Sequence, residues 1–232
     1  MKTKTTLITT MTLVLILAVF ANTAVAFRMP FSRSEREVLT EINTFDEGVA
    51  GWKTFSLPFD AEISTDDLRV SHNGVLMNLQ QAQSQNLLYD NIMVFDPTDN
   101  CWQFVTDLEP GNAYIVYVLV SDDITLSAVG SHSDGSGPIT LQRGWNYFGL
   151  PTTEQIPVSG LRFSCDEKGI ENLDIHRAHG ILVHKYQFWH LTNGDPYYGV
   201  IDLDNDVIVP GDGYLIYCYQ DNVEVSFAPI FR

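Results

Sequence analysis

Basic side chains and long apolar runs are both scarce in this sequence of 232 residues. Only 13 Lys and Arg stand against 29 Asp and Glu, which gives a formal net charge of −16. Such an excess of negative charge repels phosphate backbones and anionic lipids, so binding to nucleic acid or to an anionic membrane surface is disfavoured. After residue 26 no stretch of about 18 apolar residues occurs, so we expect no membrane insertion of the mature chain.

Cysteine is also rare. Three cysteines are too few for a disulfide-rich scaffold, but in an oxidising compartment they allow one bond and leave one thiol over. Cys218 falls inside an apolar strand pattern and is interpreted as a buried thiol. If a bond forms, the pair Cys101 and Cys165 is the first choice.

The sequence lacks the local signatures of common enzymes. It has no Gly-x-Ser-x-Gly elbow, no Ser-x-x-Lys motif, no His-Glu-x-x-His and no glycine-rich phosphate loop. The number of acids would permit a glycosidase pair, but the distance between two carboxylates defines such a pair. We therefore predict a protein that is not an enzyme.

The first 26 residues have the pattern of a signal peptide. Lys2 and Lys4 precede an apolar run over residues 13–20, and Ala24-Val25-Ala26 is a small-x-small cleavage site. We expect a secreted or periplasmic protein, with association to the cell surface as one form of this localisation. Residues 27–36 show no clear period and are predicted to be a loose N-terminal arm.

An internal duplication organises the remainder. Gly51-Trp52 and Ser56-Leu57-Pro58 return 93 residues later as Gly144-Trp145 and Gly149-Leu150-Pro151. Pro110-Gly111-Asn112-Ala113-Tyr114 returns 100 residues later as Pro210-Gly211-Asp212-Gly213-Tyr214, so the second copy has gained residues between its motifs. We predict two β-domain repeats, residues 37–130 and 139–232, joined by a polar linker at 131–138.

Each copy reads as a series of short strands separated by turn residues, five or six per copy. Residues 92–105 are predicted to form a hairpin, and residues 181–191 a shorter counterpart with a turn near Tyr186. Residues 114–119 and 214–219 are apolar on both faces and are therefore predicted to be central strands. Residues 64–68 offer one capped helical turn, and residues 75–88 a short helix or a packed loop. The fold class is all-β, with two tandem similar barrel-like or sandwich-like domains.

The paired motifs resemble a recurrent extracellular β-domain of bacterial and archaeal surface and secreted proteins. That pattern runs Gly-Trp-Asn-x-x-Ser-Leu-Pro, then Tyr-Asp-Pro followed by Trp, then Leu-x-Pro-Gly-x-Gly-Tyr-Trp. The residues of the first copy that match it are Gly51-Trp52, Ser56-Leu57-Pro58, Phe95-Asp96-Pro97, Trp102, Leu108, Pro110-Gly111 and Tyr114. Those of the second copy are Gly144-Trp145-Asn146, Leu150-Pro151, Trp189 and Pro210-Gly211-Asp212-Gly213-Tyr214. The second copy departs from it by having Lys185-Tyr186-Gln187 where Asp-Pro is expected. The resemblance implies structural turns and core aromatics, and an accessory or interaction role.

Aromatic residues of the second copy are candidates for binding. Tyr186 and Trp189 lie in the predicted hairpin. Tyr197 and Tyr198 have no counterparts in the first copy and lie in the insertion at residues 192–209, a gap that the first copy spans with far fewer residues. Exposed rings in an exported β-domain can stack on sugar faces. Trp189 has the competing interpretation of a core residue, because Trp102 is taken as its equivalent.

The sequence contains two candidate sets of metal ligands. Asp202, Asp204 and Asp206 resemble the start of a calcium loop, but Val207 stands where the glycine of an EF-hand should be, so only an irregular Ca²⁺ site is compatible. His176 and His179 have a spacing that one helical turn would bring to the same face, where imidazoles can bind zinc or copper.

The predicted function is an exported, non-catalytic structural or interaction module with carbohydrate, a cell-surface polymer or another surface protein as its partner. The insertion at residues 192–209 is the predicted place of binding. The alternative is a metal-assisted hydrolase that uses the histidines of the second copy.

Overall fold

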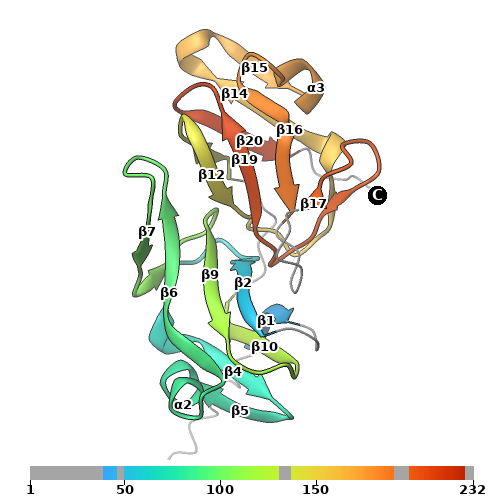
Figure 1. Cartoon of the computed structure of the whole chain (residues 1–232). Coiled ribbons are helices and arrows are strands. Elements are labelled where there is room, and N and C mark those ends of the chain that lie inside the picture. Colours follow the sequence, from blue (N-terminus) through green and yellow to red (C-terminus); the bar gives the residue numbers. More distant parts are fainter. Residues whose placement is uncertain (1–38, 46–49, 131–136, 191–198, 228–232) are drawn as a thin grey trace, which may run out of the picture. The chain divides into compact units, whose positions relative to one another are not determined.

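The computed structural model describes residues 39–45, 50–130, 137–190 and 199–227, with the backbone alone at residues 90, 186–190 and 199–200. The predicted signal peptide and arm lie outside the described residues. Those described belong to one compact unit, which is built almost entirely from antiparallel strands (Figure 1). The all-β prediction is confirmed. No helix in the described ranges is both long and apolar enough to cross a membrane.

In the first half of the chain, which we define as residues 37–130, the strands form two sheets of four and one of two. The first sheet has the order β1-β10-β4-β5, from β1 (Leu39–Phe45), β10 (Ile124–Val129), β4 (Arg69–His72) and β5 (Val75–Asn78). The second has the order β2-β9-β6-β7, from β2 (Gly51–Ser56), β9 (Ala113–Val118), β6 (Leu88–Asp96) and β7 (Cys101–Phe104). The two-stranded sheet pairs β3 (Ile63–Ser64) with β8 (Asp107–Leu108).

In the second half, residues 139–232, the same arrangement recurs. One sheet has the order β11-β20-β14-β15, from β11 (Ile139–Leu141), β20 (Val223–Phe227), β14 (Leu161–Cys165) and β15 (Ile170–Leu173). The other has the order β12-β19-β16-β17, from β12 (Gly144–Phe148), β19 (Tyr214–Cys218), β16 (Val183–His190) and β17 (Gly199–Val200). The short pair is β13 (Ile156–Pro157) with β18 (Val207–Ile208).

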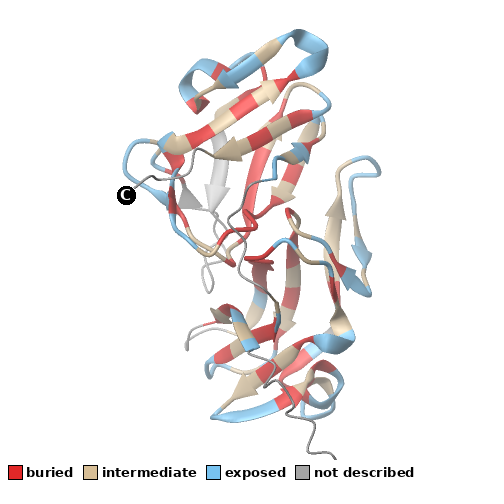
Figure 2. Cartoon of the chain, turned by 180° about the vertical axis from the view of Figure 1, so that it is seen from behind, coloured by how far each residue is buried: buried red, intermediate tan, exposed pale blue. Residues whose placement is uncertain are grey.

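The strand order of each sheet in one half is therefore the strand order of its counterpart in the other. Strands β9 and β19, which were predicted to be central from their two apolar faces, each lie between two neighbours. Each half also has its own hydrophobic core, one drawn from residues 42–128 and the other from residues 141–225. Buried residues alternate with more exposed ones along many of the strands (Figure 2).

In the described residues, the helices are short segments of three to six residues, and three of them have side-chain caps. The predicted turn at residues 64–68 is the 3-10 helix η1 (Thr65–Asp67), and the Oγ of Ser64 accepts from the amide of Asp66. The region 75–88 contains both β5 and α2 (Leu79–Ser84), which begins at a capping box between Asn78 and Gln81. The second half has η2 (Val158–Gly160), η3 (Asp166–Lys168) and α3 (Ile175–Ala178), which Asp174 caps.

Two details of the strand prediction were wrong. The described part of each half contains ten strands rather than five or six, because several two-residue pairings and edge strands carry no visible alternation. The predicted hairpin at residues 181–191 is one continuous strand, β16, with an irregular register between Val183 and Phe188. Trp189 pairs with Leu215 of β19, as Met93 of β6 pairs with Ile115 of β9, so its equivalent in the first half is Met93 and not Trp102.

The three cysteines are free thiols, so the proposed bond between Cys101 and Cys165 is absent. Cys101 begins the exposed edge strand β7, whereas Cys165 lies in the core of the second half. Cys218 is buried, as its place in an apolar strand predicted.

The two halves meet through reciprocal contacts of their equivalent motifs. The amide of Ser56 donates to the carbonyl of Gly211 at 2.7 Å, and the amide of Gly149 donates to the carbonyl of Gly111 at 3.1 Å. The side chain of Asn43 adds hydrogen bonds to the carbonyl of Gly211 and to the carboxylate of Asp212. The repeated Leu-Pro and Pro-Gly motifs thus connect the halves as well as ending strands.

Candidate functional site

The central strands present one face to the core and the other outward. In β9, Tyr114, Val116 and Val118 are buried, whereas Ile115 and Tyr117 are only half-buried. Because side chains alternate along a strand, Ile115 and Tyr117 lie on the face of the sheet that points away from the core. This outward face is apolar, which explains why β9 reads as hydrophobic on both sides.

A row of three aromatic rings crosses this face in the first half. Tyr117 pairs with Trp52 of β2 on one side and with Tyr89 of β6 on the other. The ring centroids of Trp52 and Tyr117 are 5.1 Å apart at 88°, and those of Tyr89 and Tyr117 are 6.4 Å apart at 77°. Edge-to-face packing of this kind is favourable for aromatic pairs. Trp52 and Tyr89 nevertheless remain 55% and 59% exposed.

The second half repeats this arrangement at equivalent positions. Trp145 of β12 pairs with Tyr217 of β19, and their ring centroids are 5.3 Å apart at 81°. Tyr217 also contacts the ring of Tyr219, which in turn contacts His184 of β16. The aromatic row therefore continues across the outward face of the second sheet.

A third cluster connects the two rows. Tyr147 of the second half packs against Phe95 and Trp102 of the first, with ring centroids 5.1 and 4.7 Å apart. Phe95 and Trp102 also contact each other across the β6 and β7 pair. These rings make the outward faces of the two sheets continuous at the point where the halves meet.

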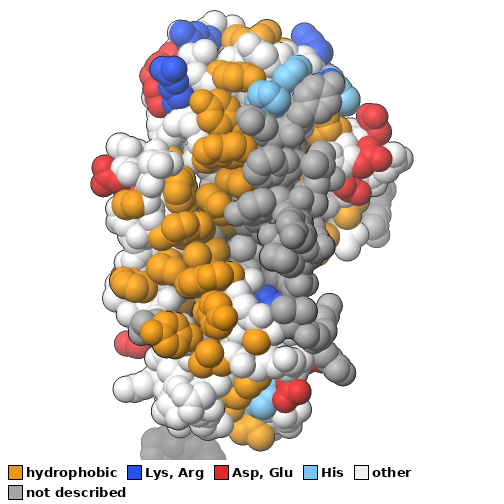
Figure 3. All heavy atoms as spheres, viewed as in Figure 1, with side chains coloured by type: hydrophobic (Ala, Val, Ile, Leu, Met, Phe, Trp, Pro, Cys, Tyr) orange, Lys and Arg blue, Asp and Glu red, His pale blue; other side chains and the backbone are white. Residues whose placement is uncertain are grey.

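We call the combined surface the aromatic strip and define it by the rings of Trp52, Tyr89, Phe95, Trp102, Tyr117, Trp145, Tyr147 and Tyr217. In the space-filling view, hydrophobic side chains form a nearly continuous band along this face, with most of the Asp, Glu, Lys and Arg visible there at its ends and margins (Figure 3). Monomeric soluble proteins seldom expose an extended apolar patch, and such patches commonly mark interaction sites.

The interpretation of the motif aromatics as core residues is only partly correct. Tyr114 and Tyr214 are core residues at 1% exposure, but Trp52 is exposed and Trp102 is half-buried on the edge strand β7. Sequence reasoning missed the aromatic strip because a repeated Trp was equated with burial. Trp52 and Trp145 stand three positions before the buried residues Phe55 and Phe148, and this odd spacing along a strand could have placed them on the opposite face.

The predicted binding aromatics of the second half fall in or next to the same sheet. Tyr186 and Trp189 are backbone positions of β16, and the segment containing Tyr197 and Tyr198 connects β16 to β17. Tyr197 and Tyr198 lie outside the described residues. The strands flanking them belong to the sheet that carries Trp145 and Tyr217.

The three aspartates of the candidate calcium loop organise a tight turn among themselves. The carboxylate of Asp202 accepts from the amide of Asp204 at 3.0 Å and from the side chain of Asn205 at 2.8 Å. The carboxylate of Asp206 accepts from the amide of Asp202 at 2.7 Å. The hydrogen bond from Asn205, followed by the one from the Asp204 amide, lowers the pKa of Asp202.

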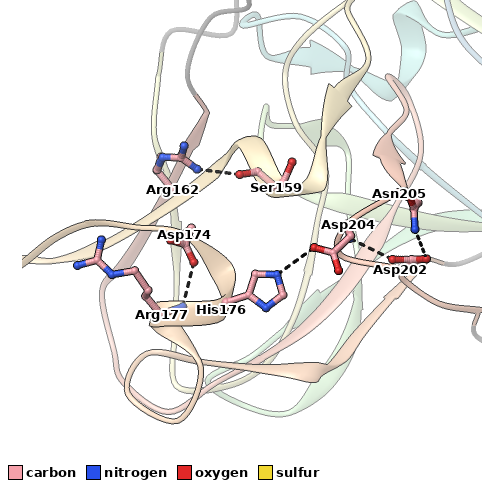
Figure 4. Close-up of polar contacts among 8 residues, drawn as sticks. All are labelled: Ser159, Arg162, Asp174, His176, Arg177, Asp202, Asp204 and Asn205. Carbon is pink, nitrogen blue, oxygen red and sulfur yellow. Dashed lines mark hydrogen bonds and ion pairs between the residues drawn. The ribbon is translucent and has the colours of Figure 1, made fainter.

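The two candidate zinc ligands have different partners. His176, in α3, lies 3.4 Å from the carboxylate of Asp204, so the structure joins one member of each predicted metal set (Figure 4). His179 instead accepts through Nδ1 from the amide of Lys185 at 3.3 Å, and its ring packs against His184. Across the described ranges, no group of three or more His, Cys, Asp or Glu is placed to hold a metal ion.

The helix α3 has its own local support. Asp174 accepts from the amide of Arg177, and this hydrogen bond is the largest cause of a lowered pKa at Asp174. Arg162 donates to the carbonyl of Ser159 nearby, so several polar side chains of this surface have partners within the fold (Figure 4). Capping and turn formation account for Asp174 and Asp202.

Comparison of the chain with protein-family models, curated proteins and solved structures finds no match.

Proposed function

We propose that this chain is an exported, non-catalytic binding module that takes carbohydrate or another cell-surface polymer on its aromatic strip. The observation that carries the proposal is Trp52, which is 55% exposed in a β-strand and is packed edge-to-face against Tyr117. Exposing a large ring to water forgoes about 25 cal/mol per Å² of apolar area that burial would stabilise. A ligand that covers the ring recovers this free energy.

The strip is suited to binding because strands and neighbouring rings fix its side chains. Rings on β2, β9, β12 and β19 lie on regular strands rather than on loops, so less conformational entropy is lost when a ligand binds. The CH-rich faces of sugars are flat and apolar, whereas their edges carry hydroxyl groups. Aromatic side chains can cover the former while water solvates the latter.

Export is proposed from the signal-peptide pattern of residues 1–26, and accessory function from the resemblance to extracellular β-domains. The shared strand order supports the proposal that the two halves are copies of one unit. A duplicated scaffold presents the same kind of surface twice, which suits attachment to a polymer better than catalysis at one point.

The test is a polysaccharide-binding screen of the mature protein and of Trp52→Ala. We expect retention on at least one polysaccharide, and a loss of about tenfold or more in affinity for Trp52→Ala. Leu76→Ala is the matched control, because Leu76 is also about half exposed but lies on β5 of the other sheet. Equal binding by wild type and Trp52→Ala would contradict the role of the strip.

A second variant, with the β16 to β17 connection shortened, tests the predicted contribution of Tyr197 and Tyr198. The rival hydrolase is tested by metal analysis after purification without chelator. Stoichiometric zinc that disappears when both His176 and His179 are changed to Ala would favour the rival.

A further inference from the structure

The aromatic strip is longer than one sheet, and its ring pairs repeat. Building on the proposed function, we infer that its ligand is a single uncharged, linear polysaccharide chain that contacts both halves of the protein at once. Three features of the strip lead to this ligand class: repetition, continuity and absence of charge.

Repetition is seen in the two equivalent ring pairs. Trp52 with Tyr117 and Trp145 with Tyr217 occupy matching strands and have nearly the same geometry, 5.1 Å at 88° and 5.3 Å at 81°. Equivalent sites offer the same chemistry to a ligand. A polymer of one repeating sugar can satisfy both sites with the same unit, whereas a folded protein partner would have to present two similar surfaces.

Continuity comes from the ring cluster at the junction of the halves. Tyr147 of β12 contacts both Phe95 and Trp102, which belong to the first half. Between the first ring pair and this cluster lie two half-buried apolar residues that pair with each other, Ile115 of β9 and Met93 of β6. A chain lying on the first pair can extend over this cluster to the second pair.

The absence of charge follows from the outward positions of the edge strands β2 and β12 and of the central strands β9 and β19. The alternation and register assign to this face the partly exposed residues Trp52, Ile115, Tyr117, Trp145, Tyr147 and Tyr217, none of which is ionisable near neutral pH, while Thr54 and Leu215 of the same face are buried. The whole sequence carries a net charge of −16 and repels anionic polymers at long range. Because these positions carry no Lys or Arg, an anionic polysaccharide would form no ion pairs there to offset that repulsion.

The experiment compares polymers that share a backbone and differ in charge. Affinity electrophoresis of the mature protein uses hydroxyethyl cellulose against carboxymethyl cellulose, and dextran against dextran sulfate. Insoluble chitin and cellulose are added as neutral pull-down substrates. We expect retardation or retention by at least one neutral polymer, and at least tenfold weaker binding to its anionic counterpart at low ionic strength.

Variants in each half test whether one chain spans both. Trp52→Ala and Trp145→Ala should each weaken binding of the polymer about tenfold. A long chain bound to one ring pair is held close to the other, so each pair strengthens binding at the other. A short oligosaccharide cannot contact both pairs, so each substitution should reduce its affinity less. Leu76→Ala and Ile181→Ala, exposed apolar positions outside the strip, are the controls in the first and second half.

The outcomes separate this inference from the proposed function. Preference for the anionic member of a pair, with sensitivity to Trp52→Ala, would refute the uncharged class and leave the proposed function intact. Neutral-polymer binding that Trp52→Ala weakens and Trp145→Ala does not would refute the spanning chain alone. Absence of binding to every polysaccharide would overturn both.

Discussion

Gly149 lies so close to Ser56 that a Cβ atom at Gly149 would overlap the Ser56 side chain. The two residues occupy equivalent positions in the Leu-Pro motifs of the two halves, and they pack against each other where the halves meet. At least one of these two equivalent positions must be glycine for the two backbones to come this close. The junction therefore requires different residues at this position in the two halves, although its backbone hydrogen bonds are reciprocal.

Gly149→Ala is expected to lower the free energy of unfolding by about 1–3 kcal/mol, because an inserted methyl group has to displace Ser56 or the carbonyl of Asp212. Adding Ser56→Gly should restore part of the loss, since the Asp212 carbonyl would still be crowded. Urea denaturation measures both effects. Gly137→Ala is the control, as its Cβ would meet nothing within 4 Å. A fully stable Gly149→Ala protein would contradict the close packing of the junction.

Tyr214→Phe is expected to cost about 1–3 kcal/mol of stability by removing the acceptor of a backbone amide. The amide of Val209 donates to the Tyr214 hydroxyl at 2.7 Å, and the tyrosine is 1% exposed. Tyr114→Phe should have a similar effect, because the amide of Glu109 donates to its hydroxyl at 2.6 Å. Thermal or chemical denaturation provides the measurement. Tyr117→Phe, on the outward face, should change stability far less, and equal losses at all three positions would argue against this role.

Cys218→Val is expected to reduce the loss of stability in alkaline solution. Burial raises the pKa of the Cys218 thiol from 9.0 to about 12. Between these values the unfolded chain releases the thiol proton and the folded protein retains it, so stability falls as the pH rises through this window. The slope is on the order of 1.4 kcal/mol per pH unit.

Valine occupies the equivalent position 118 and cannot ionise, so Cys218→Val should fold and show a shallower decline above pH 9. Unfolding free energies measured from pH 8 to pH 11 test this expectation. Cys101→Ser, at an exposed position, is the control and should keep the wild-type slope. Identical slopes for Cys218→Val and wild type would refute the contribution of the buried thiol.

Asp202→Ala is expected to loosen the turn at residues 202–206 without unfolding the protein. The substitution removes the acceptor for the Asp204 amide and for the Asn205 side chain. Amide hydrogen exchange at Asp204 should become faster, whereas exchange in β19 should stay unchanged. Asp99→Ala, in the turn between β6 and β7, is the control. Because the pKa of Asp202 is lowered in the folded protein, its stabilising effect is present above its usual pKa and is lost as the pH falls through the folded pKa.

The alternation of residues along the strands determined much of the architecture. Two-sided apolar patterns placed β9 and β19 in the middle of their sheets, and the repeated motifs predicted matching series of strands in the two halves. These features depend on local periodicity and turn chemistry, which a sequence displays directly. Cys218 was likewise predictable as a buried residue from its neighbours.

The tertiary structure alone decided which apolar face is covered. Periodicity shows that a strand has two apolar faces. A face is buried only if another element packs on it, and the sequence of the strand does not show whether one does. Trp52 and Tyr114 belong to equally conspicuous motifs, yet one is exposed and the other buried. Contacts between distant segments, such as His176 with Asp204, could not be predicted either, because they depend on how α3 and the turn at residues 202–206 approach each other in space.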